Sequence, residues 1–354
     1  MKKILYAVAL LASCSFITVV AADQHCTLGP VAPSHEIVRR AAFDIGSGKI
    51  KMEISDVDVT ANKITNVLFS DTANVALRED LTKSLDGRFS LEIQNKTIEA
   101  ISHLMKIALP YHPIAYHGIA TEAFRIAKNG SCLAERIKQE TGLEITIVSQ
   151  EEEGILGFTS AVSVANIDPE KAVSWDFGGG SFQITTKCGE NFCVYQGRLG
   201  KVPFKHALLK IQGKDPQTSS PNPISRSDVD RTIQYIKENI QGVPSEICQK
   251  LQDADTRVLA VGIHPLWGMP QNTHYDLGRI VQELECRLNL DDEAICKKGC
   301  ISADKREAAA YVVSNLILAY GVMEALGICT VEYVGTQGAN ATGTLLTPDY
   351  WKKG

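Results

Sequence analysis

Apolar runs and alternating apolar and polar residues, the pattern of buried and half-buried β-strands, recur along the first half of the chain. They lie at residues 41–44, 50–55, 64–69, 116–120 and 144–148. Apolar residues with helical spacing lie at 91–108, 123–127, 132–140 and 150–164. The first half therefore predicts strands and helices in the order βββαβαβα.

The same order begins again at Ala172. The pattern predicts a strand, a hairpin, two helices, a strand, two more helices and a last strand, at 172–176, 181–199, 204–211, 227–240, 257–261, 277–288, 306–326 and 330–334. Two copies of a mixed sheet flanked by helices predict an α/β protein with a ligand-binding cleft between two lobes. We expect the lobes at 38–168 and 169–354.

The first 22 residues have the pattern of a signal peptide. Lys2 and Lys3 precede an apolar run at 4–20, and small residues close it at 20–22. The segment Leu11–Cys14 also resembles a bacterial lipobox, in which Cys14 would carry a lipid. We therefore expect an exported protein, either periplasmic or secreted in soluble form, or anchored to the membrane through Cys14.

Charge and cysteine content narrow the class of protein further. The 354 residues carry 36 basic and 41 acidic side chains, a net charge of −5, which argues against a nucleic-acid partner. Ten cysteines fit an oxidising compartment. Cys188 and Cys193 flank a short turn between two predicted strands, so we expect them to form a disulfide across a hairpin.

Two segments share a construction that suits phosphate. Residues 42–48 (AFDIGSG) and 174–181 (SWDFGGGS) each run from an apolar strand through Asp and Gly to Ser. Glycine lets successive backbone N–H groups converge on an anion, and Ser adds a hydroxyl donor. The leading carboxylates, Asp44 and Asp176, can hold a divalent cation that shields phosphate charge. A P-loop does not fit residues 46–49, because its first Gly and its Ser or Thr are missing.

The pair of turns resembles the phosphate-binding loops of the actin-like superfamily. Between them, residues 120–129 (ATEAFRIAKN) and 148–153 (VSQEEE) are similar to two motifs of the exopolyphosphatase/guanosine pentaphosphate phosphohydrolase (Ppx/GppA) family. The close resemblance covers residues 41–199. It implies two actin-like, ribonuclease H-like lobes with an interlobe cleft, and hydrolysis of a terminal phosphoanhydride bond.

The resemblance also implies roles for individual residues. Glu153 takes the position of the catalytic base, and Arg125 that of a residue that grips substrate oxygens. Asp44 and Asp176, with Gln183, take the metal positions for Mg²⁺. Phosphate-binding positions fall on the two turns, at Gly46, Ser47, Gly178, Gly179, Gly180 and Ser181. The implied substrate is inorganic polyphosphate or another phosphoanhydride, and a homodimer is left open.

Three neighbouring glutamates, at positions 151–153, differ in their predicted roles. Ser149 and Glu152 have the spacing of a capping box at the start of the 150–164 helix, which gives Glu152 a structural role. Glu151 is a solvated charge favoured by the helix N-terminus. Glu153 has no such duty, which favours a function for its carboxylate.

Departures from the family pattern leave two other functions open. Gln183 stands where the family commonly has Glu, and residues 261–264 (VGIH) and 341–343 (ATG) replace a Gly-Gly-Thr-like and an Arg-Glu-Gly segment. A weakened metal site would leave a protein that binds phosphate or polyphosphate. An extracytoplasmic nucleoside triphosphate hydrolase is the other alternative, although the altered second-lobe segment favours polyphosphate.

Overall fold

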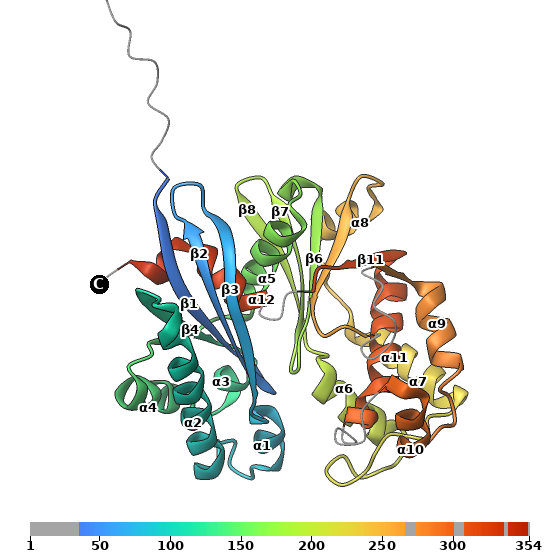
Figure 1. Cartoon of the computed structure of the whole chain (residues 1–354). Coiled ribbons are helices and arrows are strands. Elements are labelled where there is room, and N and C mark those ends of the chain that lie inside the picture. Colours follow the sequence, from blue (N-terminus) through green and yellow to red (C-terminus); the bar gives the residue numbers. More distant parts are fainter. Residues whose placement is uncertain (1–34, 266–273, 301–307, 336–338, 353–354) are drawn as a thin grey trace, which may run out of the picture. The chain divides into compact units, whose positions relative to one another are not determined.

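The computed structural model describes residues 35–265, 274–300, 308–335 and 339–352, which form one compact unit. The expected signal peptide and Cys14 lie outside the described residues. The described part is a mixed α/β structure built on two sheets (Figure 1).

The first sheet has the strand order β3-β2-β1-β4-β5. β1 pairs antiparallel with β2 and parallel with β4, so a hairpin meander continues into a parallel half. Its strands are β1 (Ile37–Ile45), β2 (Lys49–Asp58), β3 (Lys63–Asn74), β4 (Ala115–Ala120) and β5 (Ile145–Ile147). The helices between and after them are α1 (Leu77–Lys83), α2 (Leu91–Ala108), α3 (Glu122–Ile126), α4 (Gly130–Thr141) and α5 (Gln150–Ala165).

The second sheet has the order β10-β11-β9-β6-β7-β8. Its strands are β6 (Ala172–Phe177), β7 (Phe182–Cys188), β8 (Asn191–Gly197), β9 (Arg257–Gly262), β10 (His274–Asp276) and β11 (Thr330–Tyr333). The helices are α6 (Lys201–Ile211), α7 (Arg226–Asn239), α8 (Ser245–Gln252), α9 (Leu277–Glu285), α10 (Asp292–Ile295), α11 (Ala309–Leu326) and α12 (Ala339–Leu346). Short helical segments lie at Leu109–Tyr111, Pro169–Lys171, Cys296–Cys300 and Pro348–Trp351.

The two sheets repeat one arrangement. In each, three antiparallel strands come first and the first of them pairs in parallel with a later strand, β1 with β4 and β6 with β9. The repeat that the sequence predicts is therefore present. Each sheet has its own apolar core, one against α1–α4 and one against α6, α7, α9 and α11.

Helix α11 is the most apolar helix of the second core. Among the described residues it alone is long and apolar enough to cross a membrane, but 61% of it is buried within the protein. Leu316, Ile317 and Leu318 are fully buried, so all sides of the helix meet protein. We interpret it as a core helix.

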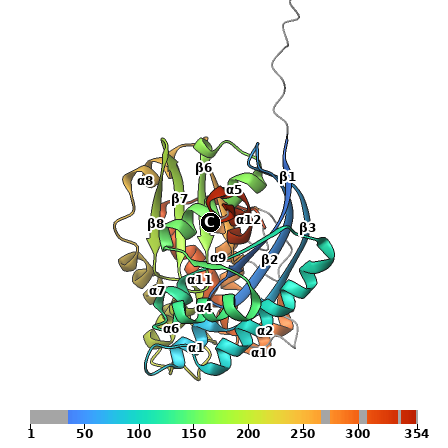
Figure 2. The same cartoon turned by 90° about the vertical axis from the view of Figure 1, so that its left-hand side faces the viewer.

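Two helices are exchanged between the halves. α5 follows the first sheet in the chain but packs on β6, β7 and β8, whereas α12 follows the second sheet but packs on β1 and β2. In both views the two helices lie side by side between the sheets (Figure 1, Figure 2). Their backbones approach closely at Gly343, where a Cβ would lie 2.2 Å from the Leu156 carbonyl oxygen.

Four helices, α1, α8, α10 and α12, and the short strand β10 were not predicted from the sequence pattern. The first three helices have only four to eight residues, too few for a clear helical period. The expected disulfide is present across the β7–β8 hairpin, where the Cα atoms of Cys188 and Cys193 are 6.0 Å apart.

Candidate active site

The two glycine turns close with the same hydrogen bond. In the β1–β2 turn the Gly46 N–H donates to the carbonyl oxygen of Lys49 at 2.9 Å, and in the β6–β7 turn the Gly178 N–H donates to that of Ser181 at 3.0 Å. Each bond begins two residues after the strand-ending Asp. The shared spacing therefore gives the turns one backbone design.

The turns face each other closely. A Cβ on Gly180 would lie 2.1 Å from Oε2 of Glu122 and 2.9 Å from Oγ of Ser47. Ser47 in turn donates its hydroxyl hydrogen to Glu122 at 3.1 Å. Only a residue without a side chain fits at Gly180, so the chain places bare backbone against the first turn.

One cavity of about 110 Å³ runs between the turns. Residues of both halves line it, together with the start of α5, the start of α6 and the C-terminal helix α12. The lining residues that carry charge or an amide are Asp44, Lys49, Lys51, Glu122, Glu153, Asp176, Lys201 and Asn340. The predicted phosphate-binding residues Gly46, Ser47, Gly178, Gly179, Gly180 and Ser181 line it as well.

Glu153 is positioned by the start of α5. Ser149 and Glu152 form the expected capping box, in which the Ser149 hydroxyl accepts from the Glu152 N–H and the Glu152 carboxylate accepts from the Ser149 N–H. Glu153 is the next residue, with a side chain that is buried and lines the cavity. The cap fixes the first turn and so directs this carboxylate inward.

The surroundings of Glu153 favour its protonated form. Burial raises the pKa of its carboxyl to about 8, and the charges of Asp176 and Asp44 act in the same direction, whereas Arg125 lowers it. The Arg125 Nη2 and Glu153 Oε2 atoms are 2.8 Å apart. A carboxyl with a pKa near neutral pH can both lose and accept a proton under working conditions, as a general base requires.

Asp44 and Asp176 form the acidic floor of the cavity. Burial raises the pKa of both, that of Asp176 to about 6, and Lys51 lowers both. The Lys51 Nζ lies 3.9 Å from Oδ2 of Asp44. Asp44 Oδ1 and Asp176 Oδ2 are buried and have no hydrogen-bond partner among the described residues.

Those two partnerless oxygens fit a divalent cation. Among the residues that the structure describes, no group of three or more His, Cys, Asp and Glu side chains is arranged to hold a metal ion. Mg²⁺ does not need such a cage, because it is usually bound by one or two carboxylates together with water and substrate phosphate. The donor set therefore suits a metal that arrives with a phosphorylated ligand.

Lys201 adds a cation from the second half of the chain. It begins α6, and burial followed by the charge of Lys49 lowers the pKa of its amine to about 8. Its Nζ lies 4.7 Å from the centre of the Tyr311 ring, in a cation–π contact. The pKa of this amine therefore lies close to neutral pH, and its side chain lines the cavity.

Comparison with known protein families matches residues 56–262 to the family described as Ppx/GppA phosphatase. This range is more than half of the chain. The chain belongs to the Ppx/GppA phosphatase family.

Curated relatives match the chain in part. Exopolyphosphatase 1 of Mycobacterium tuberculosis (strain ATCC 25618 / H37Rv) is 26% identical over 153 residues, which are 43% of this chain and 43% of that protein. The bifunctional 3-dehydroquinate synthase/phosphatase of Fusobacterium nucleatum is 27% identical over 151 residues, 41% of this chain and 22% of that protein. The chain thus matches less than half the length of these curated relatives.

Solved structures of the Ppx/GppA family have the same fold. The family member from Aquifex aeolicus has a TM-score of 0.68 at 17% identity and covers 88% of this chain and 97% of that chain. An exopolyphosphatase from Cytophaga hutchinsonii has a TM-score of 0.66 at 15% identity, with 87% and 97% covered. The predicted fold class, two actin-like lobes with mixed sheets flanked by helices, is confirmed.

Two predicted site residues do not line the cavity. Arg125 pairs with Glu153 and donates from Nη1 to the Val148 carbonyl oxygen at 2.9 Å. Gln183 is buried beside the second turn, and its Nε2 donates to Oγ of Ser181 at 3.1 Å. Contact of Arg125 with phosphate and of Gln183 with metal both stay predictions.

Six polar residues of the cavity were not predicted from the sequence: Lys49, Lys51, Thr121, Glu122, Lys201 and Asn340. Glu122 lies within the family-like segment 120–129, so that motif could have singled it out. Lys51 follows the first turn along β2, where alternation points its side chain to the same face as Lys49. Asn340 lies in α12, far along the chain, and no local pattern connects it with either turn.

Proposed function

We propose that this chain is an exported, Mg²⁺-dependent phosphohydrolase that releases the terminal phosphate of inorganic polyphosphate or a related phosphoanhydride. One observation carries the proposal. Two glycine turns of the same design, each led by a buried Asp, meet in one cavity with a buried Glu. The exopolyphosphatase relatives support the same reaction class.

In this mechanism the backbone holds the phosphate. The N–H groups of the glycine turns and the hydroxyls of Ser47 and Ser181 bind phosphate oxygens, because small residues let the chain approach the anion. Asp44 and Asp176 would hold Mg²⁺, which when bound would neutralise charge on the phosphate oxygens. Lys51 of β2 and Lys201 of α6 both add positive charge to the cavity.

Glu153 acts on the attacking water. Its carboxylate accepts a proton from a water that lies in line with the bond to the leaving phosphate, so that the P–O bond breaks as the new one forms. Arg125 holds the Glu153 side chain and favours its ionised form. This pair gives a base whose pKa lies near the working pH.

A panel of phosphate-release assays tests the proposal. The purified mature chain is mixed with pyrophosphate, tripolyphosphate, long-chain polyphosphate, ATP and GTP, with Mg²⁺ and with a chelator. We expect release that needs the metal and is faster from polyphosphate than from ATP or GTP. Faster turnover of a nucleoside triphosphate would favour a nucleotidase, and no release from any substrate would favour a polyphosphate-binding protein.

The position of Gly262 and Ile263 supports the preference for polyphosphate. Both line the cavity, where the sequence departs from the superfamily pattern. Tyr333 donates its hydroxyl hydrogen to the Gly262 carbonyl oxygen at 3.0 Å, and the Tyr333 ring packs against His264 with centres 4.3 Å apart. Side chains of this half therefore occupy space next to the cavity.

Export is tested separately. Cell fractionation and N-terminal analysis should find the mature chain outside the cytoplasm, without residues 1–22 in the soluble form or beginning at Cys14 in the anchored form. Palmitate labelling that depends on Cys14 would show the anchored form. A full-length cytoplasmic chain would contradict the proposal of export.

A further inference from the structure

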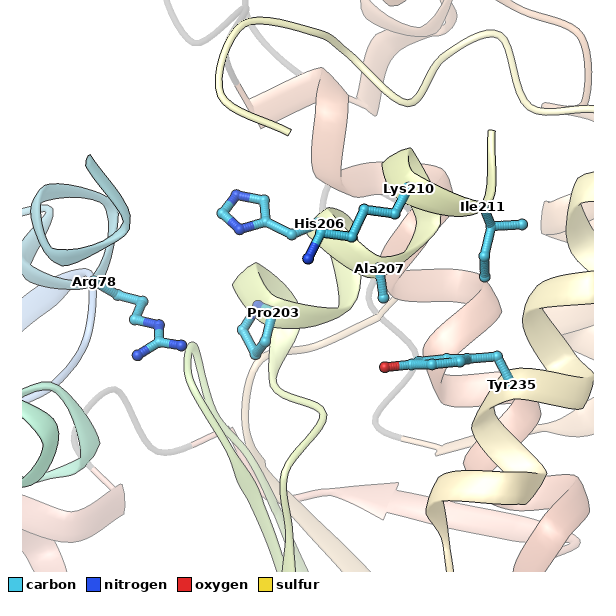
Figure 3. A pocket seen from close by; sticks show the side chains of 7 residues that line it. All are labelled: Arg78, Pro203, His206, Ala207, Lys210, Ile211 and Tyr235. Carbon is cyan, nitrogen blue, oxygen red and sulfur yellow. The ribbon is translucent and has the colours of Figure 1, made fainter. Parts of the chain in front are cut away.

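A second cavity, of about 480 Å³, lies against helix α6 (Figure 3). Figure 3 shows Arg78 on one side of it, with residues of α6 opposite and the Tyr235 ring of α7 below. The residues that line it are Arg78, Pro203, His206, Ala207, Lys210, Ile211 and Tyr235. Arg78 belongs to α1, so the two halves of the chain both contribute.

The charge of this cavity has one sign. Arg78 and Lys210 are cationic, His206 adds an imidazole ring, and the described residues that line the cavity include no carboxylate. Side chains of one sign around a hollow raise the local concentration of the opposite charge. The chain as a whole is acidic, with a net charge of −5, so this local excess of cations is not a general property of its surface.

Two buried nitrogens of the lining side chains lack partners. The Arg78 Nε and His206 Nε2 atoms have no hydrogen-bond partner among the described residues, and protein covers both, so neither opens onto the cavity. The case for an anionic ligand therefore rests on the charged side chains of Arg78 and Lys210, because a guanidinium and an ammonium form charge-assisted hydrogen bonds with phosphate oxygens.

The second cavity begins where the candidate active site ends. The Arg78 N–H donates to the Ser47 carbonyl oxygen at 2.8 Å, and the Arg78 Nη1 pairs with Glu122 at 3.0 Å. Ser47 and Glu122 both line the active-site cavity. Along α6, Lys201 and Val202 line the first cavity and Pro203 lines the second.

The volumes of the two cavities suggest that they bind different phosphate groups of the substrate. The first, about 110 Å³, is less than a quarter of the second, so a chain of several phosphates extends beyond it. We propose that the second cavity is an anion-binding subsite, which takes phosphate groups of the substrate that lie beyond the terminal phosphate. This inference rests on the proposed function, and it makes the subsite the source of any preference for longer chains.

Binding to a slowed enzyme tests the subsite directly. In a Glu153→Gln background, the dissociation constants of pyrophosphate, tripolyphosphate and long-chain polyphosphate are measured by calorimetry with Mg²⁺. Lys210→Ala is then added; Lys210 is exposed, so its loss should leave the fold intact. We expect about a tenfold weaker binding of long-chain polyphosphate, as for the loss of one charged hydrogen bond, and a smaller loss as the chain shortens.

Lys237→Ala is the matched control. Lys237 lies on α7, two residues after Tyr235, and pairs with Glu324 instead of lining the cavity. It removes the same charge from the same half of the chain. An equal loss in this control, or a Lys210→Ala loss that is equal for all chain lengths, would overturn the subsite. His206→Ala should repeat the length-dependent loss without a change in formal charge at neutral pH, because burial and Lys205 lower the pKa of the imidazole.

Different results would contradict the subsite and the proposed function. If wild-type protein releases no phosphate but Lys210→Ala still weakens long-chain binding selectively, the subsite stands in a protein that binds polyphosphate. If phosphate is released and no length dependence appears in either binding or KM, the function stands and the subsite is wrong. Both results come from the same purified proteins.

Discussion

The β1–β2 turn and the β6–β7 turn close with a hydrogen bond of the same spacing and have different surroundings. Around the first, charged side chains gather: Lys49 and Lys51 follow it on β2, and Glu122 and Arg78 pair beside it. Around the second, three consecutive glycines and Ser181 present mainly backbone.

The comparison indicates a division of roles between two copies of one design. More charged side chains surround the first turn, although Asp176 and Lys201 of the second half also line the cavity. In the proposed mechanism the glycine-rich second turn contributes mainly backbone N–H groups. The base belongs to neither turn, since Glu153 comes from α5, the exchanged helix between the sheets. Substitutions in the first turn, in the second turn and at Glu153 should therefore have different effects on turnover, binding and stability.

The largest effect is expected from Glu153→Gln. The amide keeps the shape of the side chain but cannot accept a proton, so turnover should fall about 10²- to 10⁴-fold while substrate binding persists. Steady-state kinetics and calorimetric binding measure the two effects. This result would place the proton chemistry outside both turns.

Glu152→Gln is the matched control on the same helix. Its carboxylate accepts from the Ser149 N–H at 2.7 Å, so the change should cost about 1 kcal/mol or less of folding free energy and leave most of the turnover. If Glu152→Gln loses turnover and Glu153→Gln keeps it, the motif has been read one residue out of register.

Gly180→Ala against Gly48→Ala separates the two turns. A Cβ at Gly180 would collide with Glu122, whereas at Gly48 no atom lies within 4 Å. Gly180→Ala should cost roughly 1–3 kcal/mol in folding free energy or in displaced groups, and should lower kcat/KM more than Gly48→Ala does. Urea unfolding and kinetics measure both. Equal losses would mean that close approach of the turns is unimportant.

The pH profile of kcat/KM should rise towards about pH 8 at limiting metal. The pKa of the Glu153 carboxyl is raised to about 8, and the base acts only when ionised. Cations bound at the neighbouring Asp side chains should move the rise to lower pH, because positive charge favours the carboxylate. Arg125→Met should move it to higher pH, and Arg136→Met, which removes an exposed pair with Glu140, should not.

The Glu153 carboxyl should also make the free energy of unfolding depend on pH. Its folded-state pKa lies above the ordinary value of 4.5, so the folded chain binds the extra proton between those values and its free energy of unfolding falls as pH rises through that window. In metal-free protein, urea unfolding from pH 5 to pH 8 should show this fall in wild type. A Glu153→Gln protein with an equally steep fall would contradict the assignment.

A further difference concerns the β7–β8 hairpin, which carries a disulfide that its counterpart β2–β3 lacks among the described residues. The bridge Cys188–Cys193 closes a loop of a few residues. Reduction should therefore cost less than the roughly 3 kcal/mol expected for a 15-residue loop. Unfolding with and without reductant measures the difference.

Local patterns predicted much of the fold. The helix predicted at 91–108 is α2 with the same bounds, and the capping box that starts α5 is present. Both depend on neighbours along the chain, namely apolar residues at helical spacing, and Ser149 with Glu152. The two Asp–Gly turns could be placed in one cleft because their repetition implied two lobes.

Other parts of the site have no local signal. Asn340 reaches the cavity only because α12 returns to the first half, which follows from packing over nearly 300 residues of chain. The pairing of Arg125 with Glu153 likewise joins α3 to α5. Such contacts depend on how the elements pack, and one sequence without its fold does not contain that information in any single window.

The exchange of α5 and α12 has a consequence for the order in which the chain can fold during synthesis. Ala42 and Val57 of the first sheet are buried against Ala341, Leu345 and Leu346 of α12. When all five strands of that sheet have been synthesised, the apolar face of the first half that α12 will cover is therefore still exposed. Because nascent chains fold from the N-terminus, this face waits until nearly 200 more residues have been added. The first half to be made is thus the last to be completed, and chaperones have a long interval in which to bind it.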